Sequence, residues 1–309
     1  MSVGSAISPI QLILPATSAN LGPGFDALGL AMAMYLTIEA KVSEDGAFSI
    51  AATGRNPDLC GSLTHNLILD TYTDVLAKAG REAPPLSLAL HNEIPLGMGC
   101  GSSAAALLAG VLLANHFGEL GWSGYEAMEE ACLREGHPDN VAACWLGWMT
   151  ASAAAAKDQK KSVVAVSCGE DCKWELMLAV PSVSLATEKA RALLPDSYSR
   201  ADAVANVQGV ALLVAAFALE RGDLLKTAMQ DRIHQPYRSE ACPLLPLLLP
   251  LAGEPGVLGV ALSGAGPSVL LIVEPGKAEE VGAKIQNLAP SAELIKTSTS
   301  KGTQIRLLR

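Results

Sequence analysis

Alternating and periodic hydrophobic positions divide the chain into short strands and helices. Leu36, Ile38, Ala40 and Val42 alternate with polar residues, which predicts a half-buried strand over 35–42. Short apolar runs predict further strands at 11–14, 86–91, 162–166, 176–180, 257–262, 269–273 and 304–308. Helical spacing predicts helices at 65–79, 103–117, 125–134, 185–194, 204–221 and 277–288, with another beginning near Pro138. Strands and helices do not alternate strictly, so we expect an α+β fold and not a doubly wound parallel sheet.

The length of the chain, 309 residues, predicts two domains, because a single hydrophobic core stops growing at roughly 250–300 residues. The stretch 151–161 is rich in Ala and Lys and looks like a tip or a boundary, so we expect domains at 1–157 and 158–309. Residues 15–31, PATSANLGPGFDALGLA, contain too much Gly, Pro and Asn to be regular throughout. We therefore expect an irregular loop after a first strand that ends at Pro15.

Composition and charge exclude several classes of protein. Half of the residues are apolar, which excludes a mainly disordered chain, and the net charge of −9 without a block of Lys or Arg argues against binding nucleic acid or an anionic membrane. The most apolar stretches, 104–114 and 244–251, are shorter than the roughly 20 residues of a membrane-spanning helix. Seven scattered Cys and no readable secretory signal predict reduced thiols in the cytoplasm.

A glycine-rich loop at 95–106, PLGMGCGSSAAA, lies between a predicted strand and a predicted helix. Glycines let several backbone N–H groups turn inward, and a helix start adds unpaired N–H groups and a partial positive charge. Together they predict an anion site without Lys or Arg, although a tight loop with a serine cap fits the same residues. The loop lacks the GxxxxGK[ST] pattern of a P-loop, and no βαβ unit supports a dinucleotide fingerprint at Gly99, Gly101 and Ala104.

Three glycine-rich segments, 15–24, 95–105 and 263–268 (SGAGPS), resemble in order the three motifs of the GHMP small-molecule kinases. Segments 18–31, EGHPDNVAA (135–143), TEKARALLP (187–195) and QDRIHQPYR (230–238) are similar to the members that act on L-homoserine. The resemblance implies an N-terminal domain like domain 2 of ribosomal protein S5 and a ferredoxin-like C-terminal domain. It also implies transfer of the ATP γ-phosphoryl group to the hydroxyl of L-homoserine, with Mg²⁺, by a homodimer.

The same resemblance assigns nucleotide binding to the second motif, with Asn66 near adenine. The residues of the motif are Pro95, Leu96, Gly97, Met98, Gly99, Cys100, Gly101, Ser102, Ser103, Ala104 and Ala105. The Ser103 hydroxyl and the Glu135 carboxylate are the expected ligands of Mg²⁺, which prefers oxygen. Glu129 and Glu130, one to two helical turns earlier, remain alternatives to Glu135, and a helix cap remains the alternative for Asn66.

An amino acid substrate requires groups for an ammonium, a carboxylate and a hydroxyl. A carboxylate suits the ammonium, and the planar fork of Arg matches the substrate carboxylate. Turn capping is the alternative for Asn20 and Asp26, and a solvated surface charge is the alternative for Arg191 and Arg238. The resemblance assigns substrate binding to Asn20, Asp26, His137, Asn140, Thr187, Arg191 and Arg238.

Two residues of the EGHPDNVAA segment are candidates for catalysis. Asn140 is expected near the reacting hydroxyl, whereas Asp139 is either a general base or a first-turn acid favoured by the helix dipole. Positioning and charge neutralisation can also suffice for phosphoryl transfer without a base. Two other functions remain open: a GHMP kinase that acts on mevalonate or a sugar, and a ligand sensor without turnover.

Overall fold

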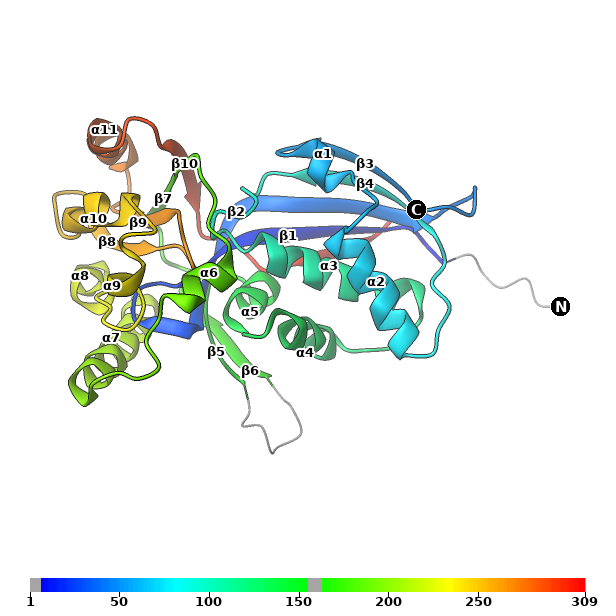
Figure 1. Ribbon diagram of the computed structural model, residues 1–309, viewed down its shortest axis with the longest axis horizontal. Coiled ribbons are helices and arrows are strands. Elements are labelled where there is room, and N and C mark those ends of the chain that lie inside the picture. Colours follow the sequence, from blue (N-terminus) through cyan, green and yellow to red (C-terminus); the bar gives the residue numbers. More distant parts are fainter. Residues whose placement is uncertain (1–6, 155–162, 309) are drawn as a thin grey trace.

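The computed structural model describes residues 7–154 and 163–308, which form two sheets with flanking helices (Figure 1). The larger sheet has the order β11-β1-β2-β4-β3, and β5 and β6 extend it from β2. All of its pairs are antiparallel except β3 with β4. Its strands are β1 (Ile10–Asn20), β2 (Gly24–Val42), β3 (Ser49–Gly54), β4 (Leu86–Asn92), β5 (Met149–Ala154), β6 (Val163–Cys168) and β11 (Gln304–Leu307).

Helices cover one face of this sheet, in front of β1 and β2 in Figure 1. The central helix α3 is apolar on all sides because it packs between α2, α4 and α5 and over β1, and it ends before Gly118. A serine caps α4 with a full capping box, in which Ser123 and Glu126 bond to each other's backbone. The helices are α1 (Pro57–Cys60), α2 (Leu67–Lys78), α3 (Ser102–Phe117), α4 (Gly124–Glu135) and α5 (Asp139–Leu146).

The second sheet is antiparallel throughout, with the order β10-β7-β9-β8. In chain order its first and third strands are central and its fourth and second are at the edges, as in a ferredoxin-like domain. Its strands are β7 (Glu175–Val180), β8 (Val257–Leu262), β9 (Val269–Val273) and β10 (Glu293–Ser298). The accompanying helices are α6 (Thr187–Ala192), α7 (Arg200–Ala218), η1 (Gly222–Leu224), α8 (Leu225–Ala228), α9 (Gln235–Arg238), α10 (Leu244–Leu248), η2 (Leu249–Leu251) and α11 (Ala278–Leu288).

The α+β class is confirmed, but the prediction for residues 15–31 is wrong. β1 continues through Pro15 to Asn20, and after a tight turn β2 begins at Gly24. The pairing of β1 with β2 shifts register at Pro15 and again before Asn20. The first of these irregularities accommodates Pro15, which has no backbone N–H to donate to the sheet. The sequence prediction also missed β3, α1, β5 and β10.

The expected division at residue 157 remains a prediction. β6 and β11 come after that point in the chain but pair with β5 and β1 of the larger sheet. Residues 151–154 of the proposed boundary belong to β5, and residues 155–161 lie outside the described part of the chain. One hydrophobic cluster runs from β1 and β2 through α3 to β7 and α7. The N- and C-terminal halves therefore share an apolar core as well as a sheet.

In the described residues, α7 is long and apolar enough to cross a membrane by length and composition alone. A single helix of this kind is weak evidence, because helices of globular proteins meet the same criterion. The Asn206 side chain of α7 donates to the Pro23 carbonyl at 3.1 Å, and Gly209 packs against the ring of Pro23. α7 is therefore anchored to the turn between β1 and β2.

Candidate active site

The loop between β4 and α3 presents backbone amides at the start of a helix. Gly97, Gly99 and Gly101 have φ angles of 68°, 76° and 70°, a region that favours glycine. A Cβ on Gly99 would lie 2.2 Å from the Ser263 carbonyl oxygen, and one on Gly101 would lie 1.9 Å from Thr17 Oγ1. Glycine is thus required at both positions by conformation and by close approach of other segments.

The first and third glycine-rich segments hold this loop from two sides. The Thr17 N–H donates to the Cys100 carbonyl at 3.0 Å, and the Ser263 hydroxyl donates to the Gly99 carbonyl at 2.7 Å. The Gly264 N–H in turn donates to the Ala19 carbonyl at 3.0 Å. The three segments are therefore assembled into one site, with carbonyls of the loop fixed from behind.

The start of α3 has free N–H groups. The first bond of the helix runs from the Ala105 N–H to the Gly101 carbonyl. Ser102, Ser103 and Ala104 have no backbone acceptor for their N–H groups among the described residues. These groups are available to an anion, together with the helix dipole. Cys100 belongs to the same wall, but burial raises the pKa of its thiol to about 12, so the thiol is protonated and turned away from solvent.

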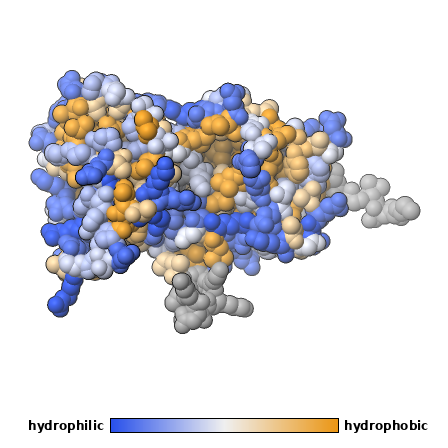
Figure 2. Space-filling view, viewed as in Figure 1, coloured by the Kyte–Doolittle hydropathy of each residue, from blue (hydrophilic) through white to orange (hydrophobic). Residues whose placement is uncertain are grey.

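Two cavities meet at Ser102 and Ser103. One has a volume of about 160 Å³ and is lined by charged and polar side chains of both halves of the chain. The other has a volume of about 300 Å³ and is lined largely by apolar residues of β2, β4, α1 and α2. Figure 2 shows a hollow in the middle of this face, near the start of α3, with hydrophobic side chains around it.

Asn66 lies in the wall of the apolar cavity and caps α2. Its Oδ1 accepts from the N–H groups of Ile68 and Leu69, and its Nδ2 donates to the carbonyls of Cys60 and Ser62. These four bonds use both donors and both lone pairs of the amide. Asn66 thus caps α2 as a buried residue and has no free amide group in this arrangement, and its contact with adenine remains a prediction.

The expected metal ligands lie side by side. The Ser103 hydroxyl donates to Glu135 Oε2 at 2.8 Å, at the junction of the two cavities. Burial raises the pKa of Glu135, although the bond from Ser103 and the nearby His137 oppose this shift. Of the alternatives, Glu130 is paired with Arg134 at 2.7 Å, and neither Glu129 nor Glu130 lines the polar cavity. The two oxygens fit Mg²⁺, which binds hard oxygen ligands.

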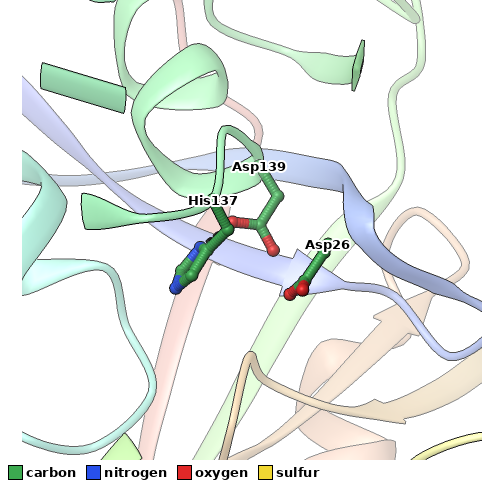
Figure 3. A group of neighbouring side chains, drawn as sticks. All are labelled: Asp26, His137 and Asp139. Atoms are coloured by element: carbon green, nitrogen blue, oxygen red, sulfur yellow. Dashed lines mark hydrogen bonds and ion pairs between the residues drawn. The ribbon is translucent and has the colours of Figure 1, made fainter. Parts of the chain in front are cut away.

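Asp26, His137 and Asp139 converge in the polar cavity (Figure 3). His137 Nδ1 donates to Asp139 Oδ1 at 2.6 Å, and the same oxygen accepts from the Asn140 N–H at 2.7 Å. Burial disfavours a charged His137, but the bond to Asp139 and the charges of Asp139 and Glu135 outweigh it, so the pKa of His137 is raised. Asp26 is paired with Arg191, whose Nη1 and Nη2 lie 3.0 and 2.5 Å from its two oxygens.

Asn140 and Asn20 are both held in the cavity wall by partners far away in sequence. Asn140 Oδ1 accepts from Thr17 Oγ1 at 2.7 Å, and its Nδ2 donates to Asp139 Oδ1 at 3.4 Å, which leaves one N–H of Nδ2 for a ligand. Asn20 Oδ1 accepts from the Asp26 N–H at 3.0 Å, and its Nδ2 donates to the Gly264 carbonyl at 2.9 Å. Asn20 therefore caps the turn after β1 and also joins the two halves of the site.

Arg238 is buried, with 1% of its surface exposed, and has no carboxylate within 4 Å among the described residues. Its guanidinium lies 5.5 Å from the centre of the Phe25 ring, and that of Arg191 lies 5.3 Å from the same centre. Burial and the neighbouring Arg191 lower the pKa of Arg238. Thr187, at the start of α6, also lines the cavity. The guanidinium groups of Arg191 and Arg238 thus share one small polar site with three carboxylates, those of Asp26, Glu135 and Asp139.

The structure adds site residues that sequence reasoning missed. The guanidinium groups of Arg191 and Arg238 both lie over the ring of Phe25. The Thr17 hydroxyl donates to the side-chain amide of Asn140 and fixes its orientation. Ser263, in the third glycine-rich segment, donates to the Gly99 carbonyl and so fixes the 95–106 loop. Phe25 and Thr17 lie inside segments that the resemblance identified, but a single aromatic or hydroxyl residue carries no signal of its contacts.

The two-sheet fold, the glycine loop and the paired cavities agree with a small-molecule kinase, and the comparisons with known proteins show that class. The profile described as "GHMP kinases N terminal domain" matches residues 66–148, and "GHMP kinases C terminal" matches residues 213–291. A homoserine kinase of Solibacter usitatus is 49% identical over 86% of both chains, and one of Desulfitobacterium hafniense is 40% identical over 91% of this chain and 93% of its own. This chain belongs to the homoserine kinase family within the GHMP kinases.

Solved structures of homoserine kinases have the same fold as this chain. A putative homoserine kinase from Listeria monocytogenes is 28% identical, covers 97% of this chain and 100% of its own, and has a TM-score of 0.78. The homoserine kinase of Cytophaga hutchinsonii is 26% identical, covers 99% and 100%, and has a TM-score of 0.80. The mevalonate kinase of L. major, 14% identical with a TM-score of 0.70, shares the fold.

Proposed function

We propose that this chain is a homoserine kinase. It transfers the γ-phosphoryl group of ATP to the hydroxyl of L-homoserine and gives O-phospho-L-homoserine, a step of threonine biosynthesis. The observation that carries the proposal is the junction of the two cavities at Ser102 and Ser103, where free helix N–H groups lie between an apolar and a charged site. Curated relatives that bear this name support it over most of their length.

The polar cavity matches the charges of an amino acid. We propose that Asp26 binds the substrate ammonium, and that Arg191 and Arg238 bind the carboxylate. In the structure Asp26 and Arg191 are paired with each other, so an amino acid that enters supplies a new partner of the right sign to each. The exchange leaves neither charge unpaired, whereas mevalonate has no ammonium for Asp26. Asn20, His137 and Thr187 complete the wall of this site.

ATP fits the other side of the junction. The apolar cavity is proposed to hold adenine, and the N–H groups of Ser102, Ser103 and Ala104 the phosphates. Ser103 and Glu135 would hold Mg²⁺, which neutralises charge on the phosphate oxygens when it is bound. Gly97, Gly99 and Gly101 let the backbone approach the nucleotide without side chains in the way.

The reacting hydroxyl is proposed to lie beside Asn140 and Asp139. The N–H of Asn140 Nδ2 that does not donate to Asp139 orients the hydroxyl oxygen, since Thr17 occupies the other end of the amide. Asp139 Oδ1 already accepts from His137 and from the Asn140 N–H, whereas Oδ2 has no hydrogen bond to a described residue. We propose that Oδ2 accepts the hydroxyl proton as the oxygen bonds to the γ-phosphorus and ADP leaves.

The decisive experiment measures ADP release with L-homoserine, mevalonate, galactose and no acceptor. Turnover with L-homoserine alone is the expected result. Turnover with mevalonate or galactose would reassign the substrate, and tight binding of L-homoserine without turnover would favour a sensor.

The cellular location and the oligomeric state of the protein are also proposals. We propose a cytoplasmic enzyme, in agreement with seven free thiols. We also propose a homodimer, as the resemblance implies, which light scattering of the purified protein tests directly. Mass equal to one chain would refute the dimer and leave the proposed activity intact.

A further inference from the structure

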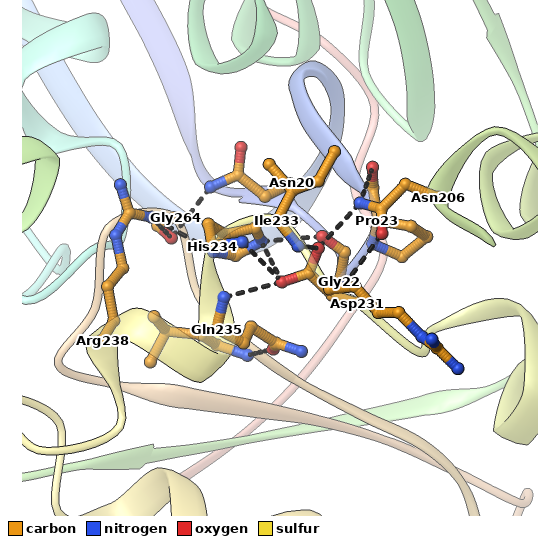
Figure 4. A network of polar contacts seen from close by, with 12 residues as sticks. Asn20, Gly22, Pro23, Asn206, Asp231, Ile233, His234, Gln235, Arg238 and Gly264 are labelled. Carbon is orange, nitrogen blue, oxygen red and sulfur yellow. Dashed lines mark hydrogen bonds and ion pairs between the residues drawn. The ribbon is translucent and has the colours of Figure 1, made fainter. Parts of the chain in front are cut away.

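A buried polar network lies behind the substrate cavity and connects α9 with the turn between β1 and β2 (Figure 4). The network includes His234 and Asp231, and neither side chain lines the polar cavity. Both are fully buried: 0% of each side chain is exposed. Buried polar groups of this kind are costly unless each is satisfied, so the partners of each atom are informative.

His234 contacts two groups that differ in what they can accept or donate. Its Nε2 lies 2.7 Å from the Gly22 carbonyl oxygen, which only accepts, so Nε2 carries the proton. Its Nδ1 lies 3.2 Å from Nη1 of Arg238, and a guanidinium only donates. Nδ1 must therefore present a lone pair. The two partners fix a neutral ring and a single tautomer.

The charged groups around His234 agree with a neutral ring. Asp231 Oδ2 is 3.6 Å from Nε2, and Arg238 lies on the opposite side. Burial lowers the pKa of His234, Arg238 lowers it further, and the charges of Asp231 and Asp26 only partly oppose this. The Phe25 ring covers His234 at 5.5 Å between ring centres and contributes no charge.

Asp231 is committed to the backbone. Its two oxygens accept from the N–H groups at the start of α9, those of Ile233, His234 and Gln235, at 2.9, 2.9 and 2.6 Å. Asn206 of α7 donates to it at 2.8 Å and also donates to the Pro23 carbonyl. The carboxylate thus fixes the base of α9, and with it the backbone from which His234 and Arg238 extend.

The guanidinium of Arg238 is held on one side and free on the other. Nε donates to the Ala190 carbonyl at 3.1 Å, and Nη1 faces His234 and, at 3.5 Å, the Gly264 carbonyl. Nη2 has no hydrogen bond within the described residues, and Arg238 lines the polar cavity. The orientation of Nη2 toward a ligand therefore depends on the acceptor at Nη1.

We infer that His234 is a positioning residue, which as a neutral acceptor aims the Arg238 guanidinium at the substrate carboxylate and ties it to the turn at Gly22. The inference rests on the proposed homoserine kinase activity. It predicts that loss of the acceptor weakens binding of L-homoserine and leaves binding of ATP unchanged.

Two amide substitutions separate the two contacts of the ring. In His234→Asn the side-chain oxygen takes the place of Nδ1 and still accepts from Arg238. In His234→Gln the amide nitrogen reaches the place of Nε2 and still donates to Gly22, but the acceptor is lost. We expect His234→Gln to raise KM for L-homoserine about tenfold or more and KM for ATP less than about twofold. His234→Asn should raise KM for L-homoserine clearly less.

Wild-type turnover with L-homoserine is measured first, so that failure of the proposed function is separate from failure of this inference. Equal increases for both variants, a larger one for His234→Asn, or parallel increases in both KM values would overturn the positioning role. Nitrogen NMR of the wild-type protein labelled at histidine provides a test that needs no variant. At neutral pH we expect His234 as the neutral Nε2–H tautomer, and an imidazolium or an Nδ1–H tautomer would overturn the inference.

Discussion

The substitution Gly101→Ala tests whether backbone amides bind the phosphates. The added Cβ would lie 1.9 Å from Thr17 Oγ1 and 3.2 Å from Asn140 Oδ1, so the start of α3 must move away from Thr17. The left-handed conformation adds about 1–2 kcal/mol of strain for a residue with a Cβ. If one charge-assisted bond from the helix start to phosphate is lost, the loss is worth about 1.5–3 kcal/mol.

These terms predict a fall of about tenfold to a hundredfold in kcat/KM for ATP. Gly80→Ala is the matched control, because Gly80 has a φ of 65° but nothing within 4 Å of the added Cβ. Gly80→Ala introduces the same left-handed backbone strain as Gly101→Ala but no steric clash. The Gly80→Ala variant should therefore lose about 1–2 kcal/mol of folding stability and keep the wild-type kcat/KM for ATP. The assay is coupled ADP release at saturating L-homoserine, with urea unfolding of both variants. Equal kcat/KM for ATP in Gly101→Ala and the wild type would refute backbone binding of the phosphates.

Three further predictions concern the polar cavity. Arg191→Ala should raise KM for L-homoserine about tenfold or more and KM for ATP far less; equal effects on both would show that Arg191 is not a substrate ligand. Asp139→Asn should lower kcat by about 10²–10⁴ with little change in either KM, as measured under saturation, and a kcat close to that of the wild type would exclude a general base. Because the pKa of His137 is raised on folding, its interaction with Asp139 contributes stability that is fully present below about pH 6.5 and lost as the pH rises through the folded-state value. Urea unfolding as a function of pH should show this loss in the wild type, and His137→Asn should lack it; the same profile in both would assign the loss to other groups.

Local sequence patterns predicted most of the helices and the central strands. The predicted helix at 103–117 is α3, which begins one residue earlier, at Ser102. The run at 204–221 was shifted, since α7 begins at Arg200 after a Ser199 cap and ends at Ala218. The sequence prediction ended β1 too early and began β2 too late, because the tight turn between them depends on Asn20, Leu21 and Asp26, which take left-handed conformations without being glycine. Tertiary contacts stabilise those conformations, and such contacts cannot be predicted from the local sequence pattern.

The resemblance located the site better than it explained it. Ser103 and Glu135 lie together as the metal hypothesis expects, and all seven proposed substrate ligands line one cavity. What holds them could not be read from the sequence, because the partners are distant: Thr17 bonds to Asn140 across 123 positions, and His234 to Gly22 across 212. Such pairs depend on the register of β1 with β2 and on the packing of α9 against their turn.

The arrangement explains how an acidic protein keeps two anions apart. A free guanidinium binds phosphate as readily as carboxylate, so cations at the phosphate site would compete for the substrate. Here the start of α3 offers only N–H groups to phosphate, while Arg191 is occupied by Asp26 and Arg238 is buried against Phe25. A triphosphate that entered the polar cavity would have to break the Asp26 pair without supplying an ammonium, and would leave a carboxylate beside its own charge. An amino acid carries both signs and meets no such cost. In the proposed function, the separation of backbone and side-chain anion sites therefore favours ATP on one side of Ser103 and a zwitterion on the other.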